Sequence, residues 1–300
     1  MTLQPVLAGT RGIICPLATP LTDDERLDDS GFDRLVDRIA PVVHGIFVLG
    51  SSGELPVLDA SVADAVVERV VDRVGGRTPV YVGAGDTSTR RTIANVRRVA
   101  RAGIDYVVVS SPYYYPTDNT SLATHFLHVA EASPLPVVLY NIPQNTGQAI
   151  SAVTVEQVAS HPNIVGLKDS AGDMLQFERF LACRSDTFAV LQGREQLAAA
   201  SLWRGGDGVI SALANLAPEL LVALWDAVEA DDRLEADRLQ ALVAQAATLF
   251  EEGYWLGALQ AALGLQGIGN GRPAAPIPTC TPEQQQVIAR LLSSLVVTHG

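Results

Sequence analysis

The sequence contains little lysine, little cysteine and no long apolar run. Of its 21 basic residues only one is a lysine, Lys168, and the other 20 are arginines. The three cysteines form no CxxC pair, and their odd number argues against a disulfide framework. No apolar run approaches the roughly 18 residues of a membrane-spanning helix. With 33 acidic residues the net charge is −12, which disfavours nucleic acid and anionic lipid as partners.

The opening residues, MTLQPVLAGTRG, show no basic segment followed by an apolar block, so we expect no secretion signal. Hydrophobic residues make up 48% of the 300 residues, which is enough to build a sizeable core. We therefore expect a soluble, cytoplasmic globular protein with no membrane partner.

Short β-branched apolar runs recur along the first two thirds of the chain, and patterns of helical period lie in the gaps between them. A strand, a crossover helix and two loops account for such spacing. The strands are expected at residues 12–15, 44–49, 79–82, 106–109, 136–140, 163–167, 187–191 and 208–211. Helical patterns cover residues 32–39, 62–70, 93–99, 120–132 and 155–159.

Eight strands alternating with helices predict an α/β fold, a (β/α)8 barrel. The competing fold, a doubly wound sheet, normally carries a glycine-rich phosphate-binding turn after its first strand. Here the first expected strand continues into CPLATP at residues 15–20, which contains no glycine.

The strand signals stop near residue 217. Residues 218–228 and 234–250 have amphipathic helical patterns, and residues 267–278 form a Gly/Pro-rich loop. Pro282 follows Thr281, a pair typical of the first turn of a helix. We expect a catalytic barrel at residues 1–216 and a C-terminal helical domain at residues 217–300.

In such barrels the catalytic groups lie at the carboxyl ends of the strands. Lys168 ends the sixth expected strand, and strand alternation places it on the same face as Ile164 and Gly166. If that face is the barrel interior, burial favours the free amine, which adds to a keto group to form a Schiff base. This is the chemistry of a class I aldolase. The alternative is a surface lysine paired with Asp169.

Other strand ends supply phenols and hydroxyls. Tyr140 ends the fifth expected strand and can give or take a proton near an imine. Ser51 and Ser52 lie in the GSSGE turn at residues 50–54, where hydroxyls can relay protons and backbone N–H groups can bind a carboxylate. Glu54 is expected only to cap this turn.

Two further groups are ambiguous. Tyr113, Tyr114 and Tyr115 lie between prolines, and either pack at a subunit interface or supply a tyrosine to a proton relay. His125 and His128 are three residues apart on one expected helix, which is a metal-like spacing. Because no third ligand accompanies them, they are interpreted as a solvated helix face.

These residues together resemble the dihydrodipicolinate synthase / N-acetylneuraminate lyase superfamily of pyruvate-dependent class I aldolases. The similarity covers most of the chain. It includes the loop at residues 19–20, GSSGE at 50–54, PYYY at 112–115, YNIP at 140–143, GLKDSAGD at 166–173 and GDGVIS at 206–211.

The resemblance implies a (β/α)8 barrel with a C-terminal helical domain, assembled as a homotetramer of two dimers. It implies Lys168 as the Schiff-base lysine and Tyr140 as the proton shuttle. It further implies that Ser51 connects Tyr140 to Tyr114 of a neighbouring subunit, and that Ser51 and Ser52 bind the pyruvate carboxylate. We also expect the substrate to contact Gly53, Asn145, Gly193 and Ile210. No metal or organic cofactor is implied.

One departure bears on the substrate. In the synthases of this superfamily an arginine after the YNxP element holds the second substrate's carboxylate, whereas this chain has Asn145. An amide cannot form the bidentate ion pair of a guanidinium. We therefore expect a lyase that makes or cleaves a C–C bond beside a pyruvate unit, acting on a 2-keto-3-deoxy sugar acid or another 4-hydroxy-2-oxo acid with an aldehyde as co-substrate. The alternatives are a 4-hydroxy-tetrahydrodipicolinate synthase, a sugar-acid dehydratase that uses the same imine, and a catalytically silent binding barrel. Arg194 is a candidate substitute anion anchor or an exposed structural residue.

Overall fold

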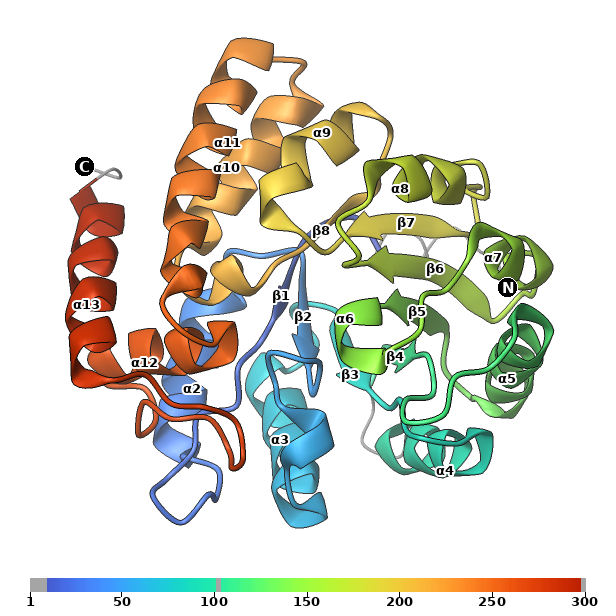
Figure 1. The fold of residues 1–300 in the computed structure, drawn as a ribbon, viewed down its shortest axis with the longest axis horizontal. Helices are drawn as coiled ribbons and strands as arrows, with labels where there is room; N and C mark the ends of the chain where they lie inside the picture. Colours follow the sequence, from blue (N-terminus) through green and yellow to red (C-terminus); the bar gives the residue numbers. More distant parts are fainter. Residues whose placement is uncertain (1–9, 101–103, 298–300) are drawn as a thin grey trace.

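Eight parallel strands close into a barrel in the order β1 to β8, as a computed structural model of the protein shows (Figure 1). The structure describes residues 10–100 and 104–297, so most of the opening segment, for which the sequence predicts no secretion signal, lies outside the described residues. The predicted (β/α)8 fold is confirmed. The strands are β1 (Gly12–Pro16), β2 (Gly45–Val48), β3 (Val80–Gly83), β4 (Tyr106–Ser110), β5 (Val137–Asn141), β6 (Ile164–Asp169), β7 (Ala189–Gln192) and β8 (Gly208–Ile210).

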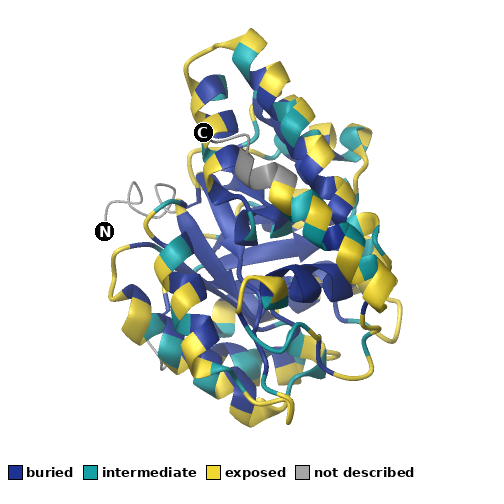
Figure 2. Ribbon diagram, turned by 90° about the vertical axis from the view of Figure 1, so that its left-hand side faces the viewer, coloured by how far each residue is buried: buried dark blue, intermediate teal, exposed yellow. Residues whose placement is uncertain are grey.

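Helices connect successive strands and cover the outside of the barrel. Each predicted helical pattern coincides with an observed helix, although the pattern at 155–159 extends one residue beyond α7, and the gaps contain further short helices. The set is α2 (Asp29–Ile39), α3 (Ala60–Val74), α4 (Thr89–Ala100), α5 (Asn119–Ala132), α6 (Pro143–Thr146), α7 (Ala152–Val158), α8 (Met174–Leu181) and α9 (Ala198–Trp203). In Figure 2 these helices are buried toward the strands and exposed outward, as amphipathic helices around a core must be.

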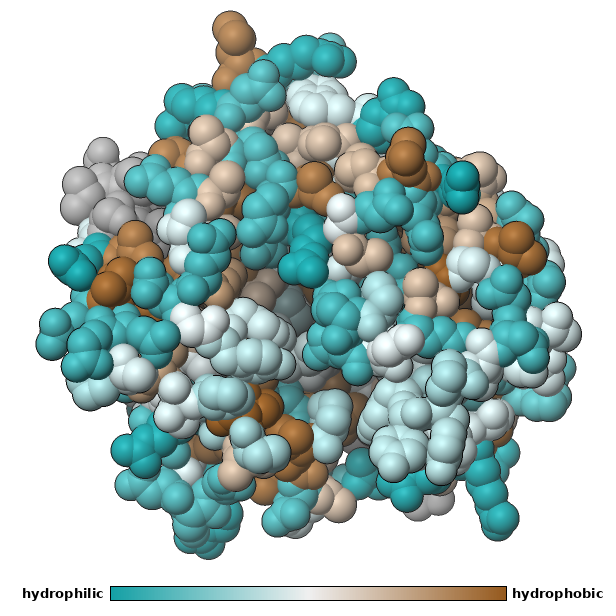
Figure 3. Space-filling model, in the orientation of Figure 1, coloured by the Kyte–Doolittle hydropathy of each residue, from teal (hydrophilic) through white to brown (hydrophobic). Residues whose placement is uncertain are grey.

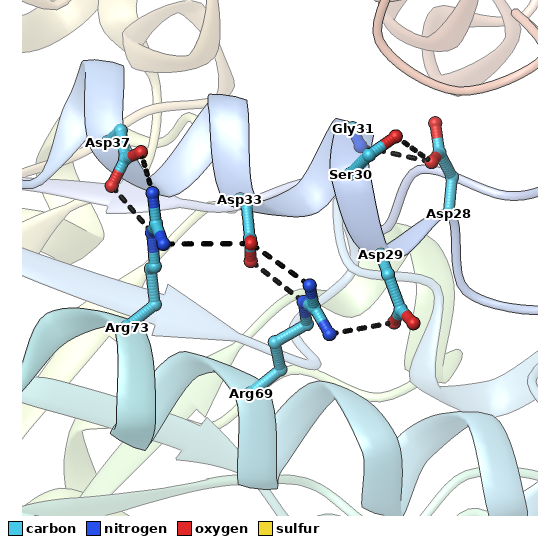
Figure 4. A network of polar contacts seen from close by, with 8 residues as sticks. All are labelled: Asp28, Asp29, Ser30, Gly31, Asp33, Asp37, Arg69 and Arg73. Atoms are coloured by element: carbon cyan, nitrogen blue, oxygen red, sulfur yellow. Dashed lines mark hydrogen bonds and ion pairs between the residues drawn. The ribbon is translucent and has the colours of Figure 1, made fainter.

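Helices α2 and α3 show how side chains one turn apart hold neighbouring helices together (Figure 4). Arg69 of α3 pairs with Asp29 and Asp33 of α2, and Arg73 pairs with Asp33 and Asp37. These side chains are partly solvent-exposed, so each pair contributes little on its own. Their interleaving mainly fixes the register between the two helices.

The barrel interior has its own apolar cluster, separate from the layer between strands and helices. It includes Phe47, Tyr140 and the stacked pair Tyr81 and Tyr106, whose ring centres are 4.5 Å apart. Side chains therefore fill the barrel as a packed core, as is usual for this fold. This core lies against Lys168, whose amine is above the Phe47 ring.

The C-terminal part of the chain is helical, as its sequence predicts. It consists of α10 (Pro218–Glu229), α11 (Arg233–Ala247), α12 (Trp255–Leu265) and α13 (Pro282–Val297). Helix α12 was not among the predicted elements. Eight of its residues are buried, so its sequence has no polar face to produce an amphipathic pattern. No described helix has the length and apolar character needed to span a membrane.

Glu54 corrects one expectation, because it joins the barrel to this C-terminal part instead of capping its own turn. Its side chain makes no cap hydrogen bond. The carboxylate is buried and accepts hydrogen bonds from Gln260 Nε2 at 2.5 Å and from the Ala274 backbone N–H at 2.7 Å. Burial raises the pKa of Glu54 to about 7, against the hydrogen bonds that lower it.

His125 corrects another expectation. Its side chain is buried on the inner face of α5 and its Nδ1 lies 2.9 Å from the hydroxyl of Thr89. Burial lowers the pKa of His125 to about 4, so the ring is neutral at pH 7. Only His128 belongs to the exposed face.

We predict that Glu54→Ala destabilises the fold, because it leaves the Gln260 and Ala274 donors buried without an acceptor. Each such donor costs about 1–3 kcal/mol. Since the folded pKa lies above that of the unfolded chain, ionisation of Glu54 opposes folding. Its stabilising contribution is therefore largest at low pH and decreases as the pH rises toward 7. Denaturant unfolding at pH 5 and pH 8 measures both effects.

The matched control is Glu68→Ala, which removes an exposed carboxylate from α3. It should change the unfolding free energy by less than about 0.5 kcal/mol. A Glu54→Ala protein as stable as this control would contradict the structural role of Glu54.

Candidate functional site

The register of two neighbouring strands brings Lys168 and Tyr140 together. Tyr140 of β5 is paired with Lys168 of β6 across the sheet. The two residues are only 6% and 4% exposed. The Lys168 Nζ lies 4.1 Å from the centre of the Tyr140 ring and 5.3 Å from that of Phe47. The ammonium is thus held by aromatic faces inside the barrel mouth.

The Tyr140 hydroxyl is the meeting point of several polar groups. Its oxygen lies 3.4 Å from Ser51 Oγ, and it also interacts with Ser170 and Lys168. Burial alone would raise the pKa of this phenol. The positive charge of Lys168 and these hydrogen bonds outweigh burial, so the pKa of Tyr140 lies below its ordinary value. A phenol in this setting is a good proton acceptor and donor.

Asp169 points away from this pair, which removes the alternative of a surface Lys168–Asp169 ion pair. Its Oδ1 accepts hydrogen bonds from Asn141 Nδ2 at 2.7 Å and from the Ala171 backbone N–H at 3.1 Å. Among the described residues, no ion pair joins Lys168 to a carboxylate. Burial raises the pKa of Asp169.

The turn after β2 carries Ser51 and Ser52 to the mouth of the barrel. It crosses β3 so closely that a Cβ on Gly83 would overlap the carbonyl oxygen of Leu49. Ser52 is 4% exposed, and both serines face the space around Lys168. Gly53 lies behind them: its carbonyl oxygen accepts a hydrogen bond from Thr19, and it lines neither of the two cavities at this end of the barrel.

Two adjoining cavities open at this end of the barrel, and Figure 3 shows the molecular surface hollowed near the middle of the corresponding face. The one that contains Lys168, here called the polar chamber, has a volume of about 340 Å³. Its neighbour, the apolar chamber, has about 260 Å³ and is walled by residues such as Leu55, Val57 and Ile277. The residues shared by both are Ser51, Tyr140, Ile142, Asn145 and Trp255.

The predicted contacts Gly193 and Ile210 both line the polar chamber, and Asn145 lies between the two chambers. Only glycine fits at position 193. A Cβ there would overlap the Ser170 hydroxyl, while the Gly193 N–H donates to the Asp169 carbonyl oxygen at 2.6 Å.

Sequence reasoning missed two residues of this site. Glu195 follows β7, lines the polar chamber and accepts a hydrogen bond from Ser211 Oγ at 3.0 Å. Its near-complete burial raises its pKa. Trp255 of α12 borders both chambers. No local sequence pattern indicates either residue. Glu195 contacts Ser211, which follows β8, and Trp255 reaches the site from a C-terminal helix, so both depend on parts of the chain that are distant in sequence.

Tyr114 is the predicted catalytic residue that a single chain does not bring into the site. Its side chain is 81% exposed and stacks edge-on against Tyr115. Its backbone φ is 90°, and its neighbour Tyr113 is the member of the run that lines the apolar chamber.

An amine buried beside a phenol at the mouth of a (β/α)8 barrel can form an imine with a keto group and exchange protons with it, which is the chemistry of a class I lyase. The family model for the dihydrodipicolinate synthetase family matches residues 9–295. The chain belongs to this family, whose members are pyruvate-dependent class I lyases and aldolases.

The relatives of this chain include proteins named as lyases and proteins named as synthases. An uncharacterized DapA-like lyase of Halobacterium salinarum is 38% identical over 90% of this chain and 88% of its own length. A 4-hydroxy-tetrahydrodipicolinate synthase of Methanopyrus kandleri is 34% identical over 95% and 96%. Among solved structures, YagE of Escherichia coli K12, in complex with pyruvate, has a TM-score of 0.90 at 31% identity and covers 95% of this chain and 98% of its own.

We predict that the pKa of Tyr140 depends on the charge of Lys168. In Lys168→Met the phenol remains buried but loses the nearby positive charge, so its pKa should rise from below its ordinary value to above it. Lys168→Arg, which keeps the charge, should leave it low. The measurement is the ultraviolet difference titration of each protein against its Tyr140→Phe counterpart. An unchanged titration in Lys168→Met would show that Lys168 does not tune this phenol.

Proposed function

We propose that this protein makes or cleaves the C–C bond next to a pyruvate unit through an imine on Lys168, with a 2-keto-3-deoxy sugar acid or a related 4-hydroxy-2-oxo acid as substrate. The observation that carries the proposal is the buried Lys168 amine within 4.1 Å of the Tyr140 ring centre. It is the only lysine of the chain.

In the cleavage direction, the Lys168 amine adds to the C2 keto group to give a carbinolamine. Tyr140 donates its proton to the departing hydroxyl, so that water leaves, the iminium forms and Tyr140 becomes a phenolate. Tyr140 then takes the proton of the C4 hydroxyl, the C3–C4 bond breaks, and its electron pair moves into the iminium to give an enamine. The aldehyde departs, Tyr140 returns the proton that it has taken to C3, and hydrolysis of the iminium releases pyruvate and the free Lys168 amine. The lowered pKa of Tyr140 supports its role as the base.

The polar chamber supports the choice of a hydroxylated substrate. Around Lys168 it offers amides and hydroxyls, including Gln144, Asn145 and Ser170, which can bind several hydroxyl groups. Ser51 and Ser52 are suited to the pyruvate carboxylate. The synthase alternative is supported by the names of several relatives, but Asn145 lacks the positive charge that it requires.

Assembly as a homotetramer of two dimers is part of this proposal. An exposed Tyr114 and an apolar chamber beside the Ser51–Tyr140 contact are complementary features of one chain. Insertion of Tyr114 from a neighbouring subunit would bury its ring and extend the hydroxyl relay.

We predict that borohydride with pyruvate adds a single pyruvate-derived group at Lys168, because reduction makes the imine permanent. Peptide mass spectrometry of the treated protein locates it. Lys168→Arg keeps the positive charge but has no amine nucleophile, so it should show neither adduct nor activity while remaining folded.

The only other ordinary amine is the N-terminus, which serves as an internal control. An adduct confined to Met1, or an active Lys168→Arg protein, would contradict the imine mechanism. A protein that takes up no pyruvate at all would favour the silent-barrel alternative.

We predict that Tyr114→Ala and Lys168→Arg, each inactive alone, restore activity when their subunits are mixed. A hybrid dimer contains one site with an intact Lys168 and a Tyr114 donated by its partner. Random mixing should therefore recover about a quarter of the wild-type activity, since half the dimers are hybrids with one working site each. If no activity returns although exchange is verified by mass, Tyr114 does not act across subunits.

We predict that this protein uses hydroxyaldehydes better than aspartate semialdehyde, and that Asn145→Arg shifts the ratio toward the latter. A charged hydrogen bond contributes about 1.5–3 kcal/mol, or roughly 10- to 200-fold in kcat/KM. Parallel kcat/KM measurements on both aldehydes test this. Efficient condensation of aspartate semialdehyde by the unmodified protein would refute it.

A further inference from the structure

The polar chamber contains a second positive charge besides Lys168. Arg194 lines it just after β7, and no other described arginine lines either chamber. Among the described residues, no carboxylate lies within ion-pair distance of Arg194, although many other arginines of the chain are paired in this way. An unpaired guanidinium on a cavity wall is available to a ligand.

The base of this side chain is held in place. The Arg194 Nε donates to the Ser170 carbonyl oxygen at 3.0 Å, and its backbone N–H donates to Gln192 Oε1 at 2.9 Å. Gln192 is itself fixed by a 2.7 Å hydrogen bond from its Nε2 to Ser201 Oγ. The two terminal amino groups of Arg194 have no acceptor within the described part of the chain. The guanidinium therefore has free hydrogen-bond donors, while its Nε holds the side chain in position.

The acidic residues of the chamber form no ion pair with Arg194. Glu195 instead accepts a hydrogen bond from Ser211 Oγ at 3.0 Å. Glu251 lines the same chamber but is exposed and makes no ion pair with Arg194. A guanidinium with two free amino groups matches the geometry of a carboxylate or a phosphate.

We propose that Arg194 binds an anionic group, carboxylate or phosphate, at the far end of the aldehyde half of the substrate. The substrate is then a 2-oxo sugar acid that carries negative charge at both ends. This inference rests on the proposed function and specifies its substrate class. The positive charge that is missing at Asn145, after β5, is thereby supplied by Arg194, after β7. At that position it can reach the end of a longer, hydroxylated substrate.

The experiment compares three aldehydes in condensation with pyruvate: glyceraldehyde, tartronate semialdehyde and glyceraldehyde 3-phosphate. They are neutral, carboxylate-ended and phosphate-ended, so the two anionic arms distinguish the source of the charge. The wild-type protein should prefer one anionic aldehyde over glyceraldehyde by about 10- to 200-fold in kcat/KM. Arg194→Gln should reduce this ratio to near one, and Arg194→Lys should retain part of it.

Arg179→Gln is the matched control, because it removes the same charge from an exposed position on α8 outside both chambers. It should keep the wild-type ratio, and circular dichroism checks that every variant is folded. A wild-type protein with no preference for an anionic aldehyde would overturn the inference, as would equal losses on all three aldehydes in Arg194→Gln and Arg194→Lys.

Pyruvate trapping separates this inference from the proposed function, since it needs no aldehyde. An intact adduct at Lys168 with no anionic preference would overturn only the role of Arg194. Absence of the adduct would overturn both.

Discussion

The hydrogen-bonded register between β5 and β6 is the constraint on which the site depends. A slip of one residue would turn Tyr140 or Lys168 to the outer face of the barrel, because side chains alternate along a strand. The next pair in the same register, Asn141 and Asp169, faces outward and forms a buried 2.7 Å side-chain hydrogen bond. The hydrogen bond on the outer face thus stabilises the strand register that places Tyr140 and Lys168 together on the inner face.

The C-terminal helices complete the barrel mouth. Helix α12 contributes Trp255 to both chambers, and Gln260 of the same helix binds Glu54 at the end of the GSSGE turn. The turn that carries Ser51 and Ser52 is therefore supported from the C-terminal side as well as by its own strand. A boundary near residue 217 divides the chain by secondary structure, but the cavity is built from both sides of it.

The sequence is sufficient to predict those residues of the site whose positions are set by the strands. All eight strands and the positions of Lys168 and Tyr140 could be predicted, because parallel strands bring their carboxyl ends to one mouth. Glu195 could not, since its hydrogen-bond partner Ser211 lies after the next strand, 16 residues further along the chain. The sequence places Glu54 only in its own turn, because its partners, Gln260 and Ala274, are more than 200 residues away.

In the proposed mechanism, the residues of the imine chemistry and the residues that select the substrate occupy physically different positions. Lys168 and Tyr140 lie on strands and are almost fully buried, so packing and register restrict any change there. Asn145 and Arg194 are exposed residues just beyond strand ends, where a substitution disturbs little of the core. An anion anchor can therefore be lost after one strand and gained after another while the amine and the phenol stay in place. Under this proposal, a barrel that keeps one imine chemistry would accept aldehydes of different charge and length.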